Sequence, residues 1–558
     1  MTHDPFAVEA LADRFWEHVL ELNPTTATFY GDERYADRLE DPSPDGRAKV
    51  RAMMQRTAEE AAAIPLEGLS TEERITRDML QVIGELAVEE DDQGLHQLRV
   101  VDQMGGPQQL LPQLTQFQRV DTPERLEAFL ARLRAYPTFM AANEGILREA
   151  LGTGLTAPSI VTERTIAQIE RLLAIPIESA IIPGSAIGAS DADRERIRDA
   201  VREHVYPADA AFLETLRGEY RHASREEPGL WSAPDGEELY RTAIRSWTTL
   251  EMDPHDIHQI GLDELDLIEA ERRVIARAAG FGDDTHAYRA SLDAEPGNTP
   301  GSKDELVARA REDIARAMAE APRYFGTLPQ AGLEVRPVEE YKERDAPFAY
   351  YYPPSADSSR NGIYYANGYD LPSRKYSKLA STTYHEAAPG HHFQITLEME
   401  NPRLNAFRRL GARMVGGAYV EGWGLYSERL ADEMGLYRSE AERFGMLDGQ
   451  AWRAARLVVD TGLHALRWER QRSIEFLRSA GLAETDAVIE TDRYICWPGQ
   501  ALTYKLGQRQ IEALRREIST RDGDRFDLRE FHDQVLGHGS LPLATLAREL
   551  PTWVATPA

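Results

Sequence analysis

The stretch Leu379-Ala-Ser-Thr-Thr-Tyr-His-Glu-Ala-Ala-Pro-Gly-His-His392 decides how this chain is interpreted, because it joins a helical run to a cluster of histidines. The run up to Glu386 is typical of a helix. Pro389 cannot donate a backbone hydrogen bond, so we expect the helix to be irregular there. Three histidines and a glutamate fall within eight residues, in a chain with only 14 histidines. Exposed histidines on a capped helix would be the simpler interpretation, but this density favours a shared chemical role.

The His385-Glu386 pair is suited to hydrolysis at a metal ion. An imidazole offers a metal a neutral nitrogen, and the next residue points about 100° further around the helix. There the carboxylate can act as base on water and later as acid on the leaving group. In the usual His-Glu-x-x-His motif, two histidines four residues apart share one helical face. Here Pro389 occupies the position expected for the second histidine.

The second ligand is therefore His391 or His392. On an unbroken helix, six residues turn through about 600° and put His391 on the wrong side. Seven residues return His392 to the right side but carry it about 10 Å along the axis. If Pro389-Gly390 swells the turn by two residues, His391 falls where the usual second ligand lies. We prefer His391 and keep His392 as the alternative.

A catalytic zinc commonly has three protein ligands, so a third must come from elsewhere. Glu421 lies 30 residues after His391, beside glycines that let a neighbouring helix approach. By itself it would be interpreted as a surface glutamate. Glu428, two helical turns later, is expected to orient a ligand histidine. Zn²⁺ is the predicted cofactor, although imidazole and carboxylate also suit manganese and cobalt.

Outside this stretch the dominant pattern is helical. Leu11, Phe15 and Val19 recur on one helical face. Thr122-Pro123 has a capping residue followed by proline at the first helical position, and Ser302-Lys-Asp-Glu305 has the form of a capping box. These patterns predict a mainly α fold, a large multi-helix body.

Two strand-prone runs precede the histidine cluster. They are Phe348-Ala-Tyr-Tyr-Tyr352 and Gly362-Ile-Tyr-Tyr365, separated by a turn-rich connection. We expect a small β-hairpin or short sheet just before the metal helix. Its edge could bind an extended peptide, which makes Tyr351 and Tyr352 candidate substrate-binding residues. A purely structural hairpin remains equally open.

The chain length of 558 residues predicts two lobes, because single cores stop growing at roughly 250–300 residues. We place an N-terminal helical lobe at 1–330 and a C-terminal lobe with the metal site at 331–558, within one continuous fold. The formal charge of −29 argues against nucleic acid and anionic membranes as partners. The sequence carries no signal for an oligomeric state.

The expected location is the cytoplasm. Cys496 is the single cysteine, so no intrachain disulfide can form, as is usual in a reducing compartment. The first residues have neither the basic start nor the apolar core of a secretory signal. No apolar run approaches the roughly 18 residues that span a bilayer.

At the histidine cluster the chain resembles a bacterial domain-of-unknown-function family of candidate zinc peptidases, whose hallmark is His-Glu-x-x-Pro-Gly-His-His. The pairing of Gly390 with His391 is also similar to that in relatives of thimet oligopeptidase and angiotensin-converting enzyme. The resemblance implies an almost wholly helical fold with a deep central channel, and one zinc held by two histidines and a glutamate. It extends to four further blocks, at Tyr419–Glu428, Arg456–His464, Arg493–Gly507 and Phe531–Leu543.

These family blocks contain the remaining candidate site residues. Amide hydrolysis needs a donor for the developing oxyanion besides the metal, and His464 and Tyr504 are the candidates. Arg456 and Arg493 could bind a substrate carboxylate in bidentate fashion. Each of these four could instead have a structural role, the arginines by pairing with nearby aspartates.

The sequence as a whole favours a zinc-dependent metallopeptidase, of oligopeptidase or carboxypeptidase type, that acts on short peptides. Glu386 would activate water on zinc held by His385, His391 and Glu421. Two other hypotheses remain: a zinc-dependent amide or ester hydrolase of small-molecule metabolism, and a non-catalytic helical binding protein.

Overall fold

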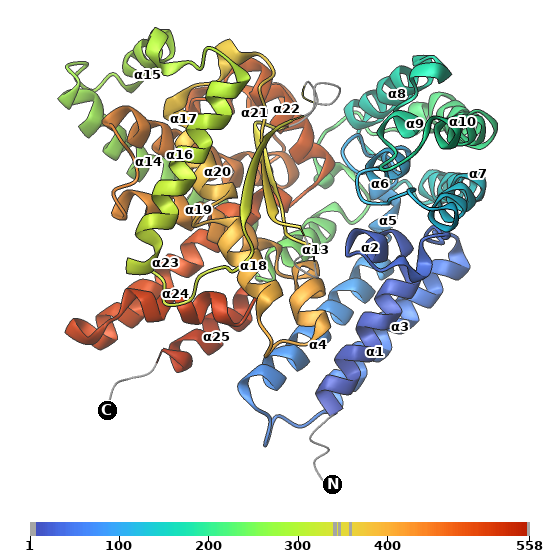
Figure 1. Cartoon of the computed structure of the whole chain (residues 1–558), viewed down its shortest axis with the longest axis horizontal. Helices are drawn as coiled ribbons and strands as arrows, with labels where there is room; N and C mark the ends of the chain where they lie inside the picture. The colour runs from blue at the N-terminus through green and yellow to red at the C-terminus, as the bar shows by residue number, and fades with distance from the viewer. Residues whose placement is uncertain (1–6, 339–342, 344–346, 356–359, 555–558) are drawn as a thin grey trace. The chain divides into compact units, whose positions relative to one another are not determined.

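The protein is mainly helical, as predicted, and the described residues include one small three-stranded sheet (Figure 1). The computed structural model describes residues 7–338, 343, 347–355 and 360–554. Helix α1 (Ala7–Leu22) buries Leu11, Phe15 and Val19, the residues of its predicted apolar face. No helix in these described ranges combines the length and apolar character needed to cross a bilayer.

The chain divides into two compact units. Unit 1 comprises Met1–Thr242, Leu463–Arg470 and Ile489–Pro498, and unit 2 comprises Ala243–Gly462, Gln471–Val488 and Gly499–Ala558. The chain thus first passes from unit 1 to unit 2 between residues 242 and 243, well before the predicted boundary at 330. The reason is that the helices between these points, such as α16 (Lys303–Glu320), pack on the sheet and on the helix that carries His385. The expected central channel stays a prediction.

Unit 1 is built from helices alone in its described residues. The helices that begin in it are α1, α2 (Pro24–Phe29), α3 (Pro44–Ala63), α4 (Thr71–Asp92), α5 (His96–Arg99), α6 (Leu110–Leu114), α7 (Pro123–Thr153), α8 (Ser159–Ala174), α9 (Ile181–Ser185), α10 (Asp191–Ala200), α11 (Tyr206–Thr215), α12 (Arg221–Ala223) and α13 (Gly236–Thr248). Thr122 caps α7 by accepting a hydrogen bond from the Arg125 backbone N–H, as its sequence predicted.

Unit 2 holds the sheet and the following helices, of which α20, α21 and α22 extend into unit 1: α14 (Pro254–Ala278), α15 (Thr285–Ala294), α16, α17 (Tyr376–Glu386), α18 (His391–Glu400), α19 (Gly417–Glu433), α20 (Glu440–His464), α21 (Arg470–Ala480), α22 (Glu484–Cys496), α23 (Thr503–Asp522), α24 (Leu528–Gly537) and α25 (Leu543–Trp553). At the start of α16 the Ser302 side chain accepts from the Glu305 N–H as expected. The Glu305 carboxylate, however, accepts from the Gly301 N–H.

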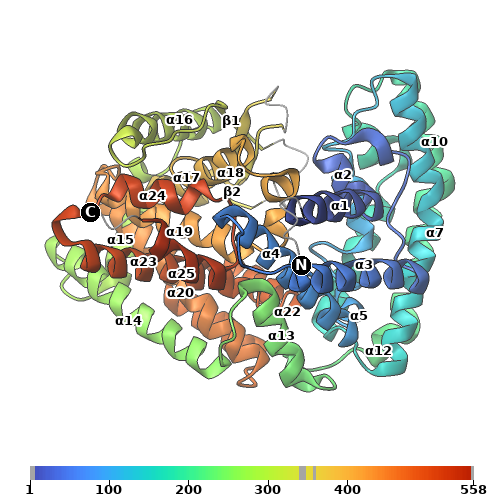
Figure 2. The ribbon, with the colours of Figure 1, turned by 90° about the horizontal axis from the view of Figure 1, so that it is seen from below.

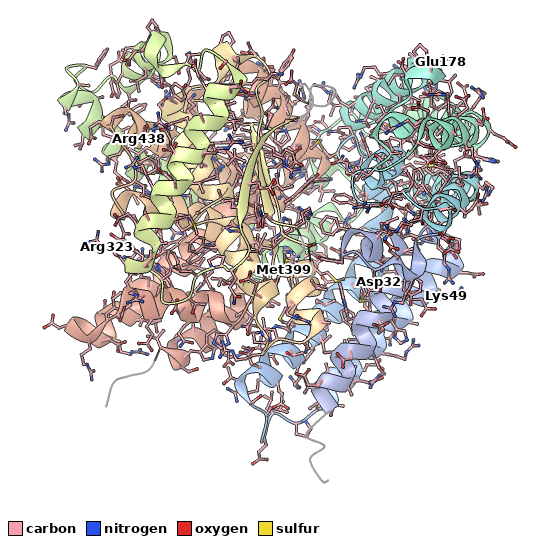
Figure 3. All side chains as sticks on the ribbon, viewed as in Figure 1. Asp32, Lys49, Glu178, Arg323, Met399 and Arg438 are labelled. Atoms are coloured by element: carbon pink, nitrogen blue, oxygen red, sulfur yellow. The ribbon has the colours of Figure 1, made fainter. Side chains whose placement is uncertain are left out.

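Charged side chains such as Lys49, Glu178 and Arg323 lie on the outside of the ribbon (Figure 3).

The sheet has the order β1-β3-β2. The predicted hairpin is confirmed, since β2 (Ala349–Tyr352) pairs antiparallel with β3 (Gly362–Ala366). Strand β1 (Leu333–Pro337), which the sequence analysis missed, pairs parallel with β3. Residues 356–359 of the predicted connection lie outside the described residues. All five residues of β3 are buried, and the sheet lies beside α16 and α17 (Figure 2).

Candidate metal centre

The motif forms two helices separated by a sharp reversal. Helix α17 ends at Glu386 and α18 begins at His391. Between them, Ala387 (φ −105°, ψ −104°) and Gly390 (φ −79°, ψ −124°) leave the helical region. A Cβ on Gly390 would lie 1.8 Å from the His385 carbonyl oxygen, so the chain folds back at a point where only glycine fits. The predicted bulge within a continuous helix is therefore wrong, because the helix breaks completely between Glu386 and His391.

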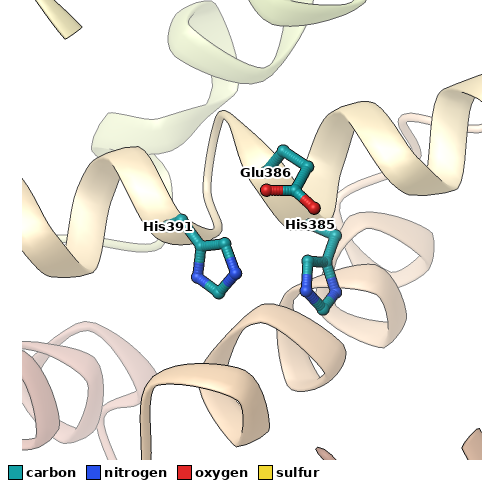
Figure 4. Close-up of side chains that lie close together, drawn as sticks. All are labelled: His385, Glu386 and His391. Atoms are coloured by element: carbon teal, nitrogen blue, oxygen red, sulfur yellow. The ribbon is translucent and has the colours of Figure 1, made fainter. Parts of the chain in front are cut away.

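This break brings His385, Glu386 and His391 together (Figure 4). One potential ligand atom from each lies within 4.8 Å of the others, and the two imidazole centroids are 4.7 Å apart. His392 faces elsewhere: its Nδ1 lies 3.0 Å from the Tyr351 hydroxyl and 3.2 Å from Thr396 Oγ1. The structure therefore brings the preferred histidine, and not the alternative, into the cluster.

Glu421 completes the cluster from α19. Its Oε2 lies 3.4 Å from His385 Nε2 and 3.6 Å from His391 Nε2. That oxygen is buried and has no hydrogen-bond partner among the described residues. Ligands about 2.0–2.2 Å from a tetrahedral zinc are separated by about 3.4 Å. The two distances from Glu421 Oε2 therefore match those between ligands of one tetrahedral cation, and the unpartnered oxygen is an observation that such a cation would explain.

Glu428 fixes the orientation of His385. Its Oε1 lies 2.9 Å from His385 Nδ1, and its Oε2 accepts a hydrogen bond of 2.8 Å from Ser381 Oγ. An ionised carboxylate only accepts, so His385 donates from Nδ1. The lone pair of Nε2 is then directed to the side where Glu421 and His391 lie, which is the arrangement common around metal-ligating histidines.

The charges of the cluster are strongly coupled. Burial lowers the pKa of His385, but Glu421 and Glu428 outweigh it and raise that pKa to about 10. Burial raises the pKa of Glu421, but the two imidazoles more than offset this and hold it well below its usual value. For Glu386 burial dominates and raises the pKa, with only partial compensation by the histidines. A metal cation would displace the proton that the raised pKa of His385 keeps on its Nε2.

The cluster is not fully closed to solvent. The side chains of His385 and His391 are buried, whereas Glu386 and Glu421 are partly exposed, Glu421 by 24%. Water can therefore reach the cluster at its two carboxylates.

Two more predicted residues lie next to this cluster. The Tyr504 ring, on α23, stacks on His385 with 6.3 Å between centroids and 26° between planes. Behind it, the Arg456 guanidinium carbon lies 4.2 Å from the Tyr504 ring centroid and 4.5 Å from that of Trp452. Tyr504 is thus in contact with a candidate ligand, and Arg456 is one ring further away.

His464 and Arg493 belong to unit 1 and have structural contacts there. His464 is buried, its Nδ1 accepts from the Leu230 N–H at 3.1 Å, and its Nε2 donates to the Tyr494 carbonyl at 3.0 Å. Burial lowers its pKa to about 3. Both ring nitrogens are used by the backbone, so the expected oxyanion role is replaced by a structural one. Arg493 lies 3.6 Å from Glu490, one turn earlier on α22, as a helical ion pair would.

The two tyrosines predicted to bind substrate also have structural contacts. Tyr351 is 9% exposed, and its hydroxyl lies within hydrogen-bond distance of His392 and Thr396. Tyr352 packs edge-on against Tyr365 with 5.6 Å between centroids. Tyr351 thus orients the histidine outside the cluster, and these contacts do not support a direct substrate role for either.

Three neighbours of Glu428 escaped the sequence analysis. Ser381 lies one helical turn before His385, a spacing that could have revealed it. Arg453, 3.8 Å from Glu428 Oε1, and Gln450, 3.4 Å from Oε2, come from α20 and had no signal in the sequence.

Comparison with known proteins places residues 24–550 in a bacterial family of unknown function. The sequence profile described as "Bacterial protein of unknown function (DUF885)" matches residues 24–550. A solved structure of a candidate lipoprotein from Colwellia psychrerythraea is 28% identical, with a TM-score of 0.90 over 98% of this chain and 99% of that one. A second, a candidate lipoprotein of unknown function from Shewanella oneidensis, is 20% identical and shares the fold, with a TM-score of 0.74 over 97% and 99%.

No curated protein matches the chain. The lipoprotein descriptions apply to those two proteins, and the cytoplasmic location expected here stays a prediction.

Proposed function

The chain belongs to the bacterial DUF885 family of unknown function, and we propose that it is a zinc-dependent metallopeptidase that hydrolyses short peptides. The supporting observation is the convergence of His385 Nε2, His391 Nε2 and Glu421 Oε2 at distances of 3.4 and 3.6 Å, beside the carboxylate of Glu386. Two imidazoles and a carboxylate form a common ligand set for catalytic zinc.

Each residue of the cluster has a distinct task in this proposal. When bound, zinc supplies a Lewis acid that polarises a carbonyl group and makes water more acidic. Glu386 accepts the proton of the attacking water and returns it to the leaving amine. Tyr504 donates to the developing oxyanion from its position against His385. Glu428 keeps the His385 ring in place through Nδ1.

Glu386 separates catalysis from simple metal binding. If His385, His391 and Glu421 supply the three ligand atoms, the partly exposed carboxylate of Glu386 beside them is available to act on water. A binding protein would not need it, and a hydrolase needs a base at that place.

The test is zinc analysis and peptide hydrolysis with wild type, Glu386→Gln and the exposed control Glu440→Gln. We expect one zinc per chain in all three. Glu386→Gln should lose hydrolysis by about 10²- to 10⁴-fold, the usual contribution of general acid–base catalysis. Chelation should abolish wild-type hydrolysis and added zinc should restore it, while Glu440→Gln behaves as wild type.

The substrates decide between the remaining hypotheses. Cleavage only of peptides with a free C-terminus would indicate a carboxypeptidase, and cleavage of blocked peptides an oligopeptidase. Turnover of small amides or esters without peptides would replace the peptidase by the alternative hydrolase. A wild type without stoichiometric metal would contradict the proposal.

A further inference from the structure

A series of hydrogen-bonded, buried polar side chains leads away from Glu428 through unit 2. Gln450 Nε2 lies 3.4 Å from Glu428 Oε2, and Gln450 Oε1 accepts from Lys505 Nζ at 2.9 Å. Gln508 Nε2 also donates to Gln450 Oε1, at 2.9 Å. Gln450 is fully buried, and Lys505 and Gln508 are each 1% exposed. This series of hydrogen bonds therefore runs through the interior between α19, α20 and α23.

The ammonium group of Lys505 sets the donor-to-acceptor direction of these hydrogen bonds. An ammonium group only donates, so the Gln450 amide must turn its oxygen toward Lys505. Its NH₂ group is then left to face Glu428 and the Leu425 carbonyl, 3.2 Å away. Lys505 thus donates to Gln450, Gln450 donates to Glu428, and His385 donates to Glu428 from the other side.

Glu428 is consequently surrounded by donors. Besides His385 and Gln450, Ser381 Oγ donates to it and the Arg453 guanidinium lies 3.8 Å away. A carboxylate with these donors around it accepts from each of them, including the Nδ1–H of His385. That contact holds the Nε2 lone pair where the candidate metal ligands meet.

Burying the ammonium group of Lys505 costs free energy that packing alone would not justify. Its closest partners are two neutral amide oxygens, Gln450 Oε1 and Gln508 Oε1 at 2.6 Å, and the carboxylate of Glu264 is 3.7 Å away. Burial lowers its pKa to about 8. A buried ionic group is often replaced by an apolar side chain of similar volume without loss of stability, so packing does not explain its presence.

We propose that Lys505 is a positioning residue that acts through Gln450 to hold Glu428 against His385, and so sets the affinity of the site for zinc. The inference rests on the proposed metal site and adds a determinant about three side chains away from it.

The test compares the Zn²⁺ affinity of purified wild type, Lys505→Met, Lys505→Arg and Gln450→Met by competition with a chromophoric chelator. We expect about tenfold weaker binding in Lys505→Met and Gln450→Met, the lower end of the effect of outer residues on metal affinity. Lys505→Arg keeps the charge and the donors and should retain most of the affinity. The visible spectrum of the Co²⁺-loaded proteins should change in the two methionine variants.

Asp448→Asn is the matched control. Asp448 is buried on the same helix as Gln450, but it pairs with Arg289 and Arg272. This variant should lower the unfolding temperature of the metal-free protein and leave the Zn²⁺ affinity unchanged, which separates loss of stability from loss of positioning.

The outcomes distinguish this inference from the proposed function. A wild type that binds no zinc overturns both. A wild type that binds zinc, with Lys505→Met and Gln450→Met binding equally tightly, overturns the positioning role alone. If Lys505→Met does not fold, Gln450→Met decides, because it removes the donor to Glu428 and leaves the lysine in place.

Discussion

His391 and His392 are adjacent in sequence but have opposite environments. His391 Nε2 lies 3.6 Å from Glu421, whereas His392 is hydrogen-bonded to Tyr351 and Thr396, and burial lowers its pKa to about 4. The difference arises because α18 starts at His391 directly after the reversal, so successive side chains diverge by about 100°. At the scale of single residues, this step in the helix selects the candidate ligand.

Replacing each histidine by alanine should therefore have different consequences. We expect His391→Ala to weaken zinc binding by more than about 100-fold, since even residues hydrogen-bonded to a ligand contribute 10- to 100-fold. His392→Ala should bind zinc normally and be less stable by about 1–3 kcal/mol, because the Tyr351 hydroxyl loses a buried partner. Metal analysis and denaturant unfolding measure the two effects. Metal loss only in His392→Ala would reverse the assignment.

At the scale of elements, helix α19 meets its neighbours through glycines. A Cβ on Gly422 would lie 2.5 Å from Gly507 Cα of α23, and a Cβ on Gly424 would lie 2.7 Å from His385 Nε2. The backbones of α19 and α23 can touch only because both residues lack side chains. The same closeness lets α19 carry Glu421 to the histidines of α17 and α18.

A methyl group at Gly424 should disturb the site directly. We expect Gly424→Ala to displace the His385 ring, weaken zinc binding and destabilise the protein by about 1–3 kcal/mol, the usual cost of overpacking. Gly417→Ala on the same helix is the control, because its Cβ would meet nothing within 4 Å. Chelator competition and thermal unfolding test both variants. Equal zinc affinity in the two would show that α19 can move away from His385 without cost.

At the scale of the whole molecule, the buried acid Asp209 makes the stability of unit 1 depend on pH. In unit 1, burial raises the pKa of Asp209 to about 7, while the Tyr136 hydroxyl donates to its Oδ1 at 2.8 Å. This pKa is above the ordinary value of about 3.9. The stability that the protonated form contributes is therefore complete below about pH 4 and is lost as the pH rises through 7.

Asp209→Asn should remove that pH dependence. The amide oxygen can still accept from Tyr136, but the side chain no longer ionises. The variant should match wild type near pH 4 and exceed it increasingly above that pH, by up to about 4 kcal/mol at pH 8 for a shift of roughly three pKa units. Thermal unfolding from pH 4 to 9 provides the measurement. A difference that does not change with pH would contradict the role of Asp209.

Local patterns in the sequence determined the helical class, the cap at Thr122, the β2–β3 pair and the location of the histidine cluster, because these depend on residues within a few positions of each other. The reversal at Gly390, the pairing of β1 and the unit boundary depend on backbone geometry and on segments far apart in the chain. The same holds for the partners of His464, which lie in segments centred on Leu230 and Tyr494. Glu421 was predicted, but only the tertiary structure brought its Oε2 to the two imidazoles and added Gln450 and Lys505 behind Glu428. These positions are set by helix packing, which no short stretch of sequence encodes.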